Sequence, residues 1–171
     1  VEAAAITNGW KLEVISKKAC PSAQIPVMYD GPQTYPECDE WQPLALEHVR
    51  SSDAQLVIIT NWRGRYDQNV DGRTKPITLD EWRAANQRLI EPLVTAGKQV
   101  LVLSDTPAPR RQVDQCLASA PRNVTRCHLD RAKTVDTEDN DMLRELTGLV
   151  GATFYDTTDW FCTPTVCPSV I

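Results

Sequence analysis

The residues best suited to chemistry lie in one polar segment directly after an apolar run. The segment reads Asn61-Trp62-Arg63-Gly64-Arg65-Tyr66, and residues 56–59 before it are Leu-Val-Ile-Ile. An asparagine amide can donate to a developing oxyanion, aromatic faces can stack on sugar rings, and arginine can bind carboxylate or hydroxyl groups. We therefore take Asn61 as an oxyanion-hole candidate. The substrate-binding candidates are Trp62, Arg63, Arg65 and Tyr66. The alternative is a solvated loop with one tryptophan packed on the core.

The two histidines are poorly placed to serve as the base of a nucleophilic triad. A self-contained Ser-His-Asp triad needs an imidazole near a hydroxyl at the ligand-binding end of a sheet. His48 falls in the middle of a helical stretch, and His128 follows Cys127 in a loop. If the protein is a hydrolase, we expect its base to lie outside this sequence.

The cysteines indicate disulfides and an oxidising compartment. The six residues are Cys20, Cys38, Cys116, Cys127, Cys162 and Cys167. An even number scattered through loop-like, proline-rich sequence is typical of exported domains. We favour pairing neighbours in sequence, which closes three short loops: Cys20–Cys38, Cys116–Cys127 and Cys162–Cys167. Two alternatives stay open: a zinc site, although the sequence has no Cys-x-x-Cys, and reduced structural cysteines in a cytosolic protein.

Helix and strand patterns alternate along the chain. We expect helices over 2–8, 39–50, 78–96 and 136–150, and strands over 11–16, 54–60, 98–104 and 153–156. The unbroken apolar runs 56–59 and 100–103 are typical of parallel strands buried on both faces. The alternation predicts a mainly parallel sheet between two helical layers.

In such open sheets, ligands bind beyond the carboxyl ends of the strands. The segments to inspect are therefore 16–20, 61–66, 105–110 and 157–160. The polar segment 61–77 is longer than a simple connector needs to be, which makes it a candidate binding loop.

Composition excludes several classes of function. The chain has 171 residues, 18 Lys plus Arg, 23 Asp plus Glu and a net charge of −5. That length suits one domain, and the negative charge gives no electrostatic reason to bind nucleic acid. The apolar runs are far shorter than the roughly 20 residues of a membrane span. No phosphate-binding glycine loop is present, so we expect no nucleotide, cofactor or metal. Neither an initiator Met nor a signal segment is visible, and we interpret the chain as an internal piece of a longer polypeptide.

Seven short segments carry a family resemblance through their order and spacing. They are Gly9-Trp10-Lys11-Leu12, Ala19-Cys20-Pro21, Tyr35-Pro36-Glu37-Cys38-Asp39-Glu40-Trp41, Ala96-Gly97-Lys98-Gln99-Val100, Ser104-Asp105-Thr106-Pro107, Asp114-Gln115-Cys116-Leu117 with Cys127, and Asp159-Trp160-Phe161-Cys162 with Val166-Cys167-Pro168. Together they resemble the extracytoplasmic SGNH-type domain fused to the C-terminus of integral-membrane acyltransferase-3 proteins, which O-acylate bacterial cell-surface glycans.

The resemblance implies one SGNH-like domain over 1–171, truncated at both ends, with a flavodoxin-like three-layer αβα sandwich. It also implies a nucleophilic Ser in a Gly-Asp-Ser motif before Val1 and an Asp-x-x-His pair after Ile171. Asn61 would be the oxyanion-hole asparagine, and the loop around Ala19 and Cys20 would replace the backbone donor that a glycine supplies in the family.

The function implied is that of an extracytoplasmic esterase or O-acyltransferase, at the periplasm or the outer face of the cell membrane. It would move a small acyl group, acetyl by preference, on or off a cell-envelope glycan, while the chain alone is inactive. Its partners would be that glycan and a membrane acyltransferase domain in the same full-length chain. The alternatives are a non-catalytic carbohydrate-binding domain on the same fold and a cytosolic flavodoxin-like regulatory domain.

Overall fold

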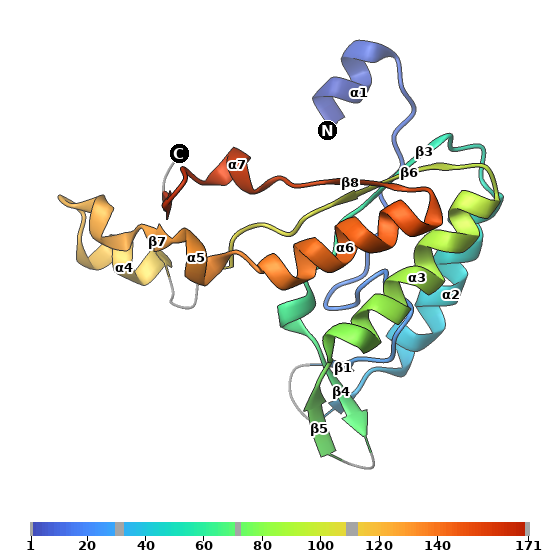
Figure 1. Cartoon of the computed structure of the whole chain (residues 1–171), viewed down its shortest axis with the longest axis horizontal. Coiled ribbons are helices and arrows are strands. Elements are labelled where there is room, and N and C mark those ends of the chain that lie inside the picture. Colours follow the sequence, from blue (N-terminus) through green and yellow to red (C-terminus); the bar gives the residue numbers. More distant parts are fainter. Residues whose placement is uncertain (1, 30–32, 71–72, 109–112, 170–171) are drawn as a thin grey trace.

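The centre of the fold is a parallel sheet of three strands in the order β3-β6-β8 (Figure 1). The structure is a computed structural model that describes residues 2–29, 33–70, 73–108 and 113–169. The strands are β3 (Leu56–Ile59), β6 (Gln99–Leu103) and β8 (Thr153–Tyr155). The predicted α/β class and parallel sheet are confirmed.

The register aligns the carboxyl ends of these strands. Ile59 lies beside Val102, and Leu103 lies beside Tyr155. All three strands run in the same direction, so the residues that follow them emerge at one edge of the sheet. This edge is where the sequence places the candidate site.

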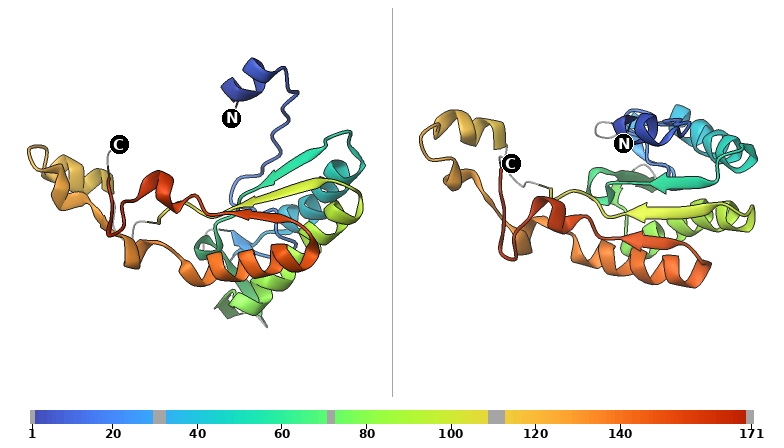
Figure 2. Two further views of the ribbon diagram at one scale, coloured as in Figure 1. Left: turned by 45° about the horizontal axis from the view of Figure 1, so that its top comes forward. Right: turned by 90° about the horizontal axis from the view of Figure 1, so that it is seen from above.

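Three helices, α2 (Pro36–Ser51), α3 (Leu79–Thr95) and α6 (Thr137–Val150), gather on one side of the sheet (Figures 1 and 2). The buried face of α3 carries Trp82, Leu89 and Leu93, at the spacing of an amphipathic helix. These side chains share one core cluster with Val100 and Val102 of β6. Fully burying each of the two leucines contributes roughly 1.5–3 kcal/mol.

Helix ends follow the signals in the sequence. The Thr78 hydroxyl accepts from the Glu81 N–H while the Glu81 carboxylate accepts from the Thr78 N–H, so the expected capping box is present. The Asp136 carboxylate accepts from the Asp139 N–H at the start of α6. Gly151 ends α6 in the left-handed conformation, with φ of 79°, which glycine adopts without a Cβ clash.

The expected burial of β3 on both faces of the sheet is wrong. The unbroken apolar run of β3 predicts burial on both faces, yet the side chains of Leu56 and Ile58 are 49% and 46% exposed. Alternate residues of a strand point to opposite faces, and within the described residues these two face away from α3 and α6. The short helix α1 (Glu2–Asn8) stands apart from those helices (Figure 2).

The predicted strand over 11–16 is wrong for the described structure. This segment is extended but belongs to no sheet, and only an isolated bridge between Lys17 and Cys20 follows it. A strand exists only where a neighbouring backbone completes its hydrogen-bond ladder. No described segment supplies such a ladder here.

The polar segment 61–77 is not a plain loop. It contains the 3-10 helix η1 (Arg63–Arg65) and an antiparallel hairpin of β4 (Asp67–Val70) with β5 (Arg73–Pro76). The sequence analysis missed this hairpin because its strands lack the apolar alternation that predicts a half-buried strand. A second small hairpin pairs β1 (Met28–Tyr29) with β2 (Gln33–Thr34).

The C-terminal third adds a lobe of short elements beside the sheet (Figure 1). In chain order these are α4 (Val113–Ser119), η2 (Val124–Cys127), β7 (Leu129–Asp130), α5 (Arg131–Thr134), α7 (Thr158–Phe161) and β9 (Val166–Cys167). None of the described residues of α4 is buried. The lobe therefore draws little stability from an apolar core.

All six cysteines pair as the sequence analysis favoured. Cys20–Cys38, Cys116–Cys127 and Cys162–Cys167 have Cα–Cα distances of 5.6, 5.7 and 4.0 Å. No cysteine is left free for a zinc site, and the reduced alternative is wrong as well. No helix in the described part of the chain is long and apolar enough to cross a membrane.

Replacing Cys116 and Cys127 together by serine is expected to lower the free energy of unfolding by about 3 kcal/mol. The bridge closes a loop across a sequence separation of 11 residues in a lobe with little core, and chain entropy sets this magnitude. Urea unfolding followed by circular dichroism measures the change. The matched control replaces Cys162 and Cys167, whose separation of 5 residues should cost less, about 2 kcal/mol. Equal stability of the parent and the first variant would contradict the role of that bridge.

Candidate active site

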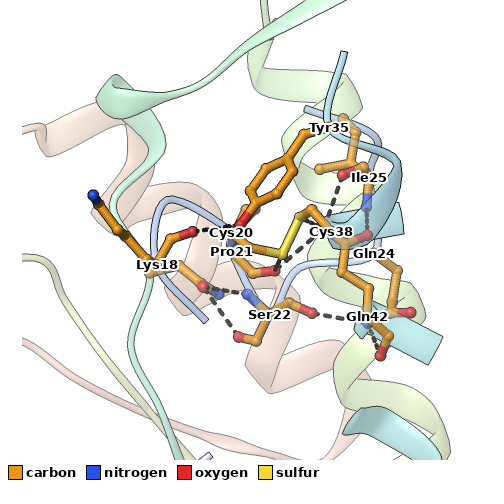
Figure 3. The surroundings of a disulfide bond; sticks show 10 residues. Lys18, Cys20, Pro21, Ser22, Gln24, Ile25, Tyr35, Cys38 and Gln42 are labelled. Carbon is orange, nitrogen blue, oxygen red and sulfur yellow. Dashed lines mark hydrogen bonds between the residues drawn. A yellow bond between two sulfur atoms is a disulfide. The ribbon is translucent and has the colours of Figure 1, made fainter. Parts of the chain in front are cut away.

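Contacts with α2 hold a short loop, residues 17–25, in place (Figure 3). The Cys20–Cys38 disulfide joins the loop to the first turn of α2. One turn further along, the buried Gln42 donates from Nε2 to the carbonyls of Pro21 (3.2 Å) and Ile25 (2.9 Å) and accepts from the Ile25 N–H (3.0 Å). Gln42 satisfies backbone groups that this irregular segment leaves unpaired, so the loop is rigid without regular secondary structure.

The fixed loop meets the segment that follows β3. The Ser22 N–H and the Ser22 hydroxyl both donate to Oδ1 of Asn61, at 2.9 and 3.0 Å. Thus the structure brings Asn61 and the loop that contains Cys20 together, at the same edge of the sheet. Ala19 lies in this loop with φ of 52°, a left-handed conformation that is uncommon outside glycine.

The contact with Ser22 fixes which way the Asn61 carboxamide points. A backbone N–H can only donate, so the atom facing it must be the carboxamide oxygen. The amide Nδ2 therefore points away from Ser22, where it is buried and has no hydrogen-bond partner among the described residues. Leaving a buried donor unpaired costs roughly 1–3 kcal/mol. A fixed, unpaired N–H donor is the property that an oxyanion hole requires.

Backbone donors near Ala19 are partly occupied. The Cys20 N–H donates to the Lys17 carbonyl at 3.2 Å, and the Ser22 N–H is held by Asn61. The expectation that this loop supplies the second oxyanion donor stays a prediction.

The aromatic candidates divide into one exposed and one packed side chain. Trp62 is 43% exposed, and its indole Nε1 lies 3.2 Å from the position of a Cβ at Gly64. A side chain at that position would displace the indole. Tyr66 stacks on the buried Trp82 with ring centroids 6.3 Å apart and packs against the core. Trp62 is therefore the more exposed of the two aromatic candidates.

The two arginine candidates lie in η1. Arg63 donates from Nη2 to the Asp136 carboxylate at 2.7 Å, and its Nε lies 3.6 Å from Oδ1 of Asp139. The Arg63 side chain is 20% exposed, so its guanidinium is largely engaged inside the protein. The side chain of Arg65 lies outside the described structure. Substrate binding by either arginine stays a prediction.

Asp139 is a buried carboxyl whose side chain is only 3% exposed. The pKa of Asp139 is raised to about 7, chiefly by burial and also by the neighbouring Asp136 and Asp105 carboxylates, while the Arg63 guanidinium opposes the rise. Asp105, directly beyond β6, shares this environment, and burial raises its pKa to about 6. Segments after β3 and β6 and the start of α6 thus meet in one charged cluster.

The ends of β6 and β8 are joined by a second polar cluster. The Ser104 hydroxyl accepts from the Thr157 N–H at 2.8 Å and lies 2.9 Å from the Thr157 hydroxyl. The Asp156 carboxylate accepts from the Thr158 N–H at 2.9 Å. The expected meeting of segments beyond the strands is therefore seen for 61–66, 105–108 and 157–158. Residues 109–110 of the predicted segment lie outside the described residues.

His128 lies in a loop position, as expected from the sequence, but His48 lies in the last turn of its helix and not in the middle. His48 is on α2 with its Nε2 2.8 Å from the Glu13 carboxylate in an exposed pair, and His128 directly follows η2. No group of three His, Cys, Asp or Glu side chains within the described ranges is arranged to hold a metal ion.

Ser22 and Asp139 are site residues that the sequence analysis missed. Ser22 directly follows Cys20-Pro21, and this proximity to the expected donor loop was the one available signal. Asp139 was interpreted only as part of an acidic helix start. Its burial depends on α3 and η1, which are distant in sequence, and no local pattern indicates it.

Comparison with known proteins identifies the family of the chain. The pattern of the family described as "SGNH domain (fused to AT3 domains)" matches residues 1–171, so the chain belongs to that family. Membership supports an acyl-transfer or hydrolase role. The resemblance drawn from the sequence is confirmed.

A solved structure, the lipopolysaccharide acetyltransferase periplasmic domain of Salmonella ser. Paratyphi A, resembles the chain with a TM-score of 0.63 at 11% sequence identity. The match covers 98% of this chain and 63% of that chain, so this chain spans less than two thirds of its neighbour's length. The shared fold is of the αβα type. None of the curated proteins matches the chain.

Asp139→Asn is expected to change how stability depends on pH. The folded carboxyl has a pKa of about 7, above its unfolded value near 4, so the native state binds more protons between these pH values. The parent therefore loses stability as pH rises from about 4 to 7, whereas the neutral amide does not. The variant should match the parent near pH 4 and exceed it at pH 8, by at most roughly 4 kcal/mol.

Urea unfolding at several pH values measures this difference. Asp141→Asn, at an exposed position of the same helix, is the matched control and should keep the parental dependence. Parallel curves for Asp139→Asn and the parent would show that the Asp139 carboxyl ionises normally in the folded protein.

Proposed function

We propose that the chain forms the middle of an extracytoplasmic SGNH-type esterase or O-acyltransferase domain. The observation that carries the proposal is the Asn61 carboxamide, which Ser22 holds with its Nδ2 buried and unpaired among the described residues. Membership of the SGNH family supports the same reaction class. The nucleophilic serine and the histidine base would come from segments flanking this chain, so the chain alone would be inactive.

In this mechanism the serine oxygen attacks the carbonyl carbon of a small acyl ester, and the histidine accepts the serine proton. The carbonyl oxygen becomes an oxyanion, to which Asn61 Nδ2 and a backbone N–H donate. Collapse of this intermediate releases the first alcohol, which takes the proton from the histidine, and leaves an acyl-serine. Water or a sugar hydroxyl then attacks the acyl-serine through the same steps. Neither a metal nor a dissociable cofactor is required.

The substrate would be a cell-envelope glycan that carries an acetyl group. Trp62 directly follows Asn61 in the chain, and its partly exposed indole would stack on a sugar. The structural neighbour is a lipopolysaccharide acetyltransferase domain, which supports a glycan substrate, and the family's fusion to AT3 domains supports a membrane acyltransferase partner in the same chain. Three disulfides support an oxidising compartment outside the cytoplasm.

The alternative is a carbohydrate-binding domain without catalysis, which the exposed Trp62 also favours. The flanking sequence separates the two functions. A Gly-Asp-Ser motif before Val1 together with Asp-x-x-His after Ile171 supports the enzyme, and loss of either motif leaves only binding.

In the full-length protein, Asn61→Ala is expected to lower kcat by about 10²–10³-fold, because one oxyanion donor is lost. Hydrolysis of p-nitrophenyl acetate measures this rate. The substitution also removes the acceptor of two hydrogen bonds from Ser22, so we expect the variant to stay folded with a free energy of unfolding lower by about 1–3 kcal/mol. The matched control is Asn8→Ala on α1, whose amide donates to the Ala4 carbonyl in an exposed position and should leave kcat unchanged. Parental kcat in Asn61→Ala would remove this residue from the mechanism.

A further inference from the structure

Arg63 of η1 forms an ion-pair cluster with Asp136 and Asp139 at the start of α6. The proposed reaction does not use this cluster directly. We propose that Arg63 is a positioning residue: by pairing with Asp136 and Asp139 it ties η1 to the start of α6 and so sets where the Asn61 amide donor lies. The inference rests on the proposed function only where it assigns a catalytic role to the Asn61 amide. The positioning itself is a property of this chain.

Two elements that are distant in sequence, η1 and α6, meet at Arg63. The guanidinium comes from η1, Asp136 is the N-cap of α6, and Asp139 lies in the first turn of α6. Arg63 is 73 residues from Asp136 in sequence, so this long-range contact joins η1 to the start of α6. Facing two carboxylates with two separate nitrogens of one guanidinium is available to arginine but not to lysine, which has a single nitrogen.

Of the two contacts of Arg63, the one with Asp139 is longer and includes no hydrogen bond. Arg63 Nε and Asp139 Oδ1 are both buried and both lack a hydrogen-bond partner among the described residues, although only 3.6 Å separates them. Each carries a desolvation cost that a hydrogen bond between them would offset. The position of η1 is therefore sensitive to the charge on Asp139.

Only Trp62 separates Arg63 from Asn61, and its backbone is extended, with φ of −114° and ψ of 99°. Because this connection is one extended residue, we expect a displacement of Arg63 to move Asn61 as well. Ser22 holds the other side of the carboxamide. Asn61 thus lies between two anchors, one on the loop 17–25 and one on α6.

Four groups face the Asp139 carboxyl. Arg63 faces it from η1, Asp136 from the N-cap of α6, Asp105 from the segment beyond β6 and the Trp82 indole from α3. Only Arg63 is a cation, so protonation of Asp139 removes one of the two partners of Arg63 and no other ion pair of the cluster. The amide signals of Asn61 should report that step.

The test is ¹H–¹⁵N NMR of the chain itself, following the Asn61 side-chain amide and the Ser22 backbone amide from pH 5 to 9. In the parent we expect both signals to titrate together. In Asp139→Asn the titration should disappear, and in Arg63→Gln the Asn61 signals should move at every pH. Arg63→Lys, which keeps the charge, should restore part of the parental position.

Arg83→Gln is the matched control, because Arg83 pairs with Glu145 at 3.0 Å and also joins a neighbouring element to α6. It should leave Asn61 and Ser22 unshifted. Parental Asn61 and Ser22 signals in folded Arg63→Gln would overturn the proposal. If that variant does not fold, an undiminished titration in Asp139→Asn overturns it equally. Neither NMR measurement depends on enzyme turnover. An inactive full-length enzyme would therefore contradict the proposed function without contradicting the positioning role of Arg63.

Discussion

The two hydrogen bonds from Ser22 to Oδ1 of Asn61 are the contact on which the rest of the site depends. They decide which end of the carboxamide faces inward, and therefore whether a donor or an acceptor is presented beyond the sheet. Gln42 and the Cys20–Cys38 bridge hold the loop that contains Ser22. The disulfide therefore contributes to the anchoring of the loop that orients Asn61.

Elements with local signals could be predicted from the sequence. The capping residues Thr78 and Glu81 fix the start of α3, and Gly151 fixes the end of α6, because each acts on backbone groups within one turn. The disulfides could be predicted because neighbouring cysteines pair. Asn61 could be placed at the sheet edge because the apolar run of β3 stops just before it.

Features that depend on distant partners could not be predicted. The segment 11–16 has strand-like composition but no described ladder partner, and the hairpin 67–76 has a partner but no apolar pattern. The role of Arg63 depends on Asp136, which is distant in sequence. In each case the deciding neighbour comes from another element. The 11% identity to a domain of the same fold shows how few individual residues the architecture itself requires.

The order of the three sulfur bridges has a consequence for how the chain matures. Each cysteine is joined to the next one along the sequence, so no bridge spans another. When such a chain enters an oxidising compartment N-terminus first, the two cysteines of each bridge arrive one directly after the other. Native pairing of these six cysteines therefore requires no earlier bridge of this sequence to be broken by a later cysteine.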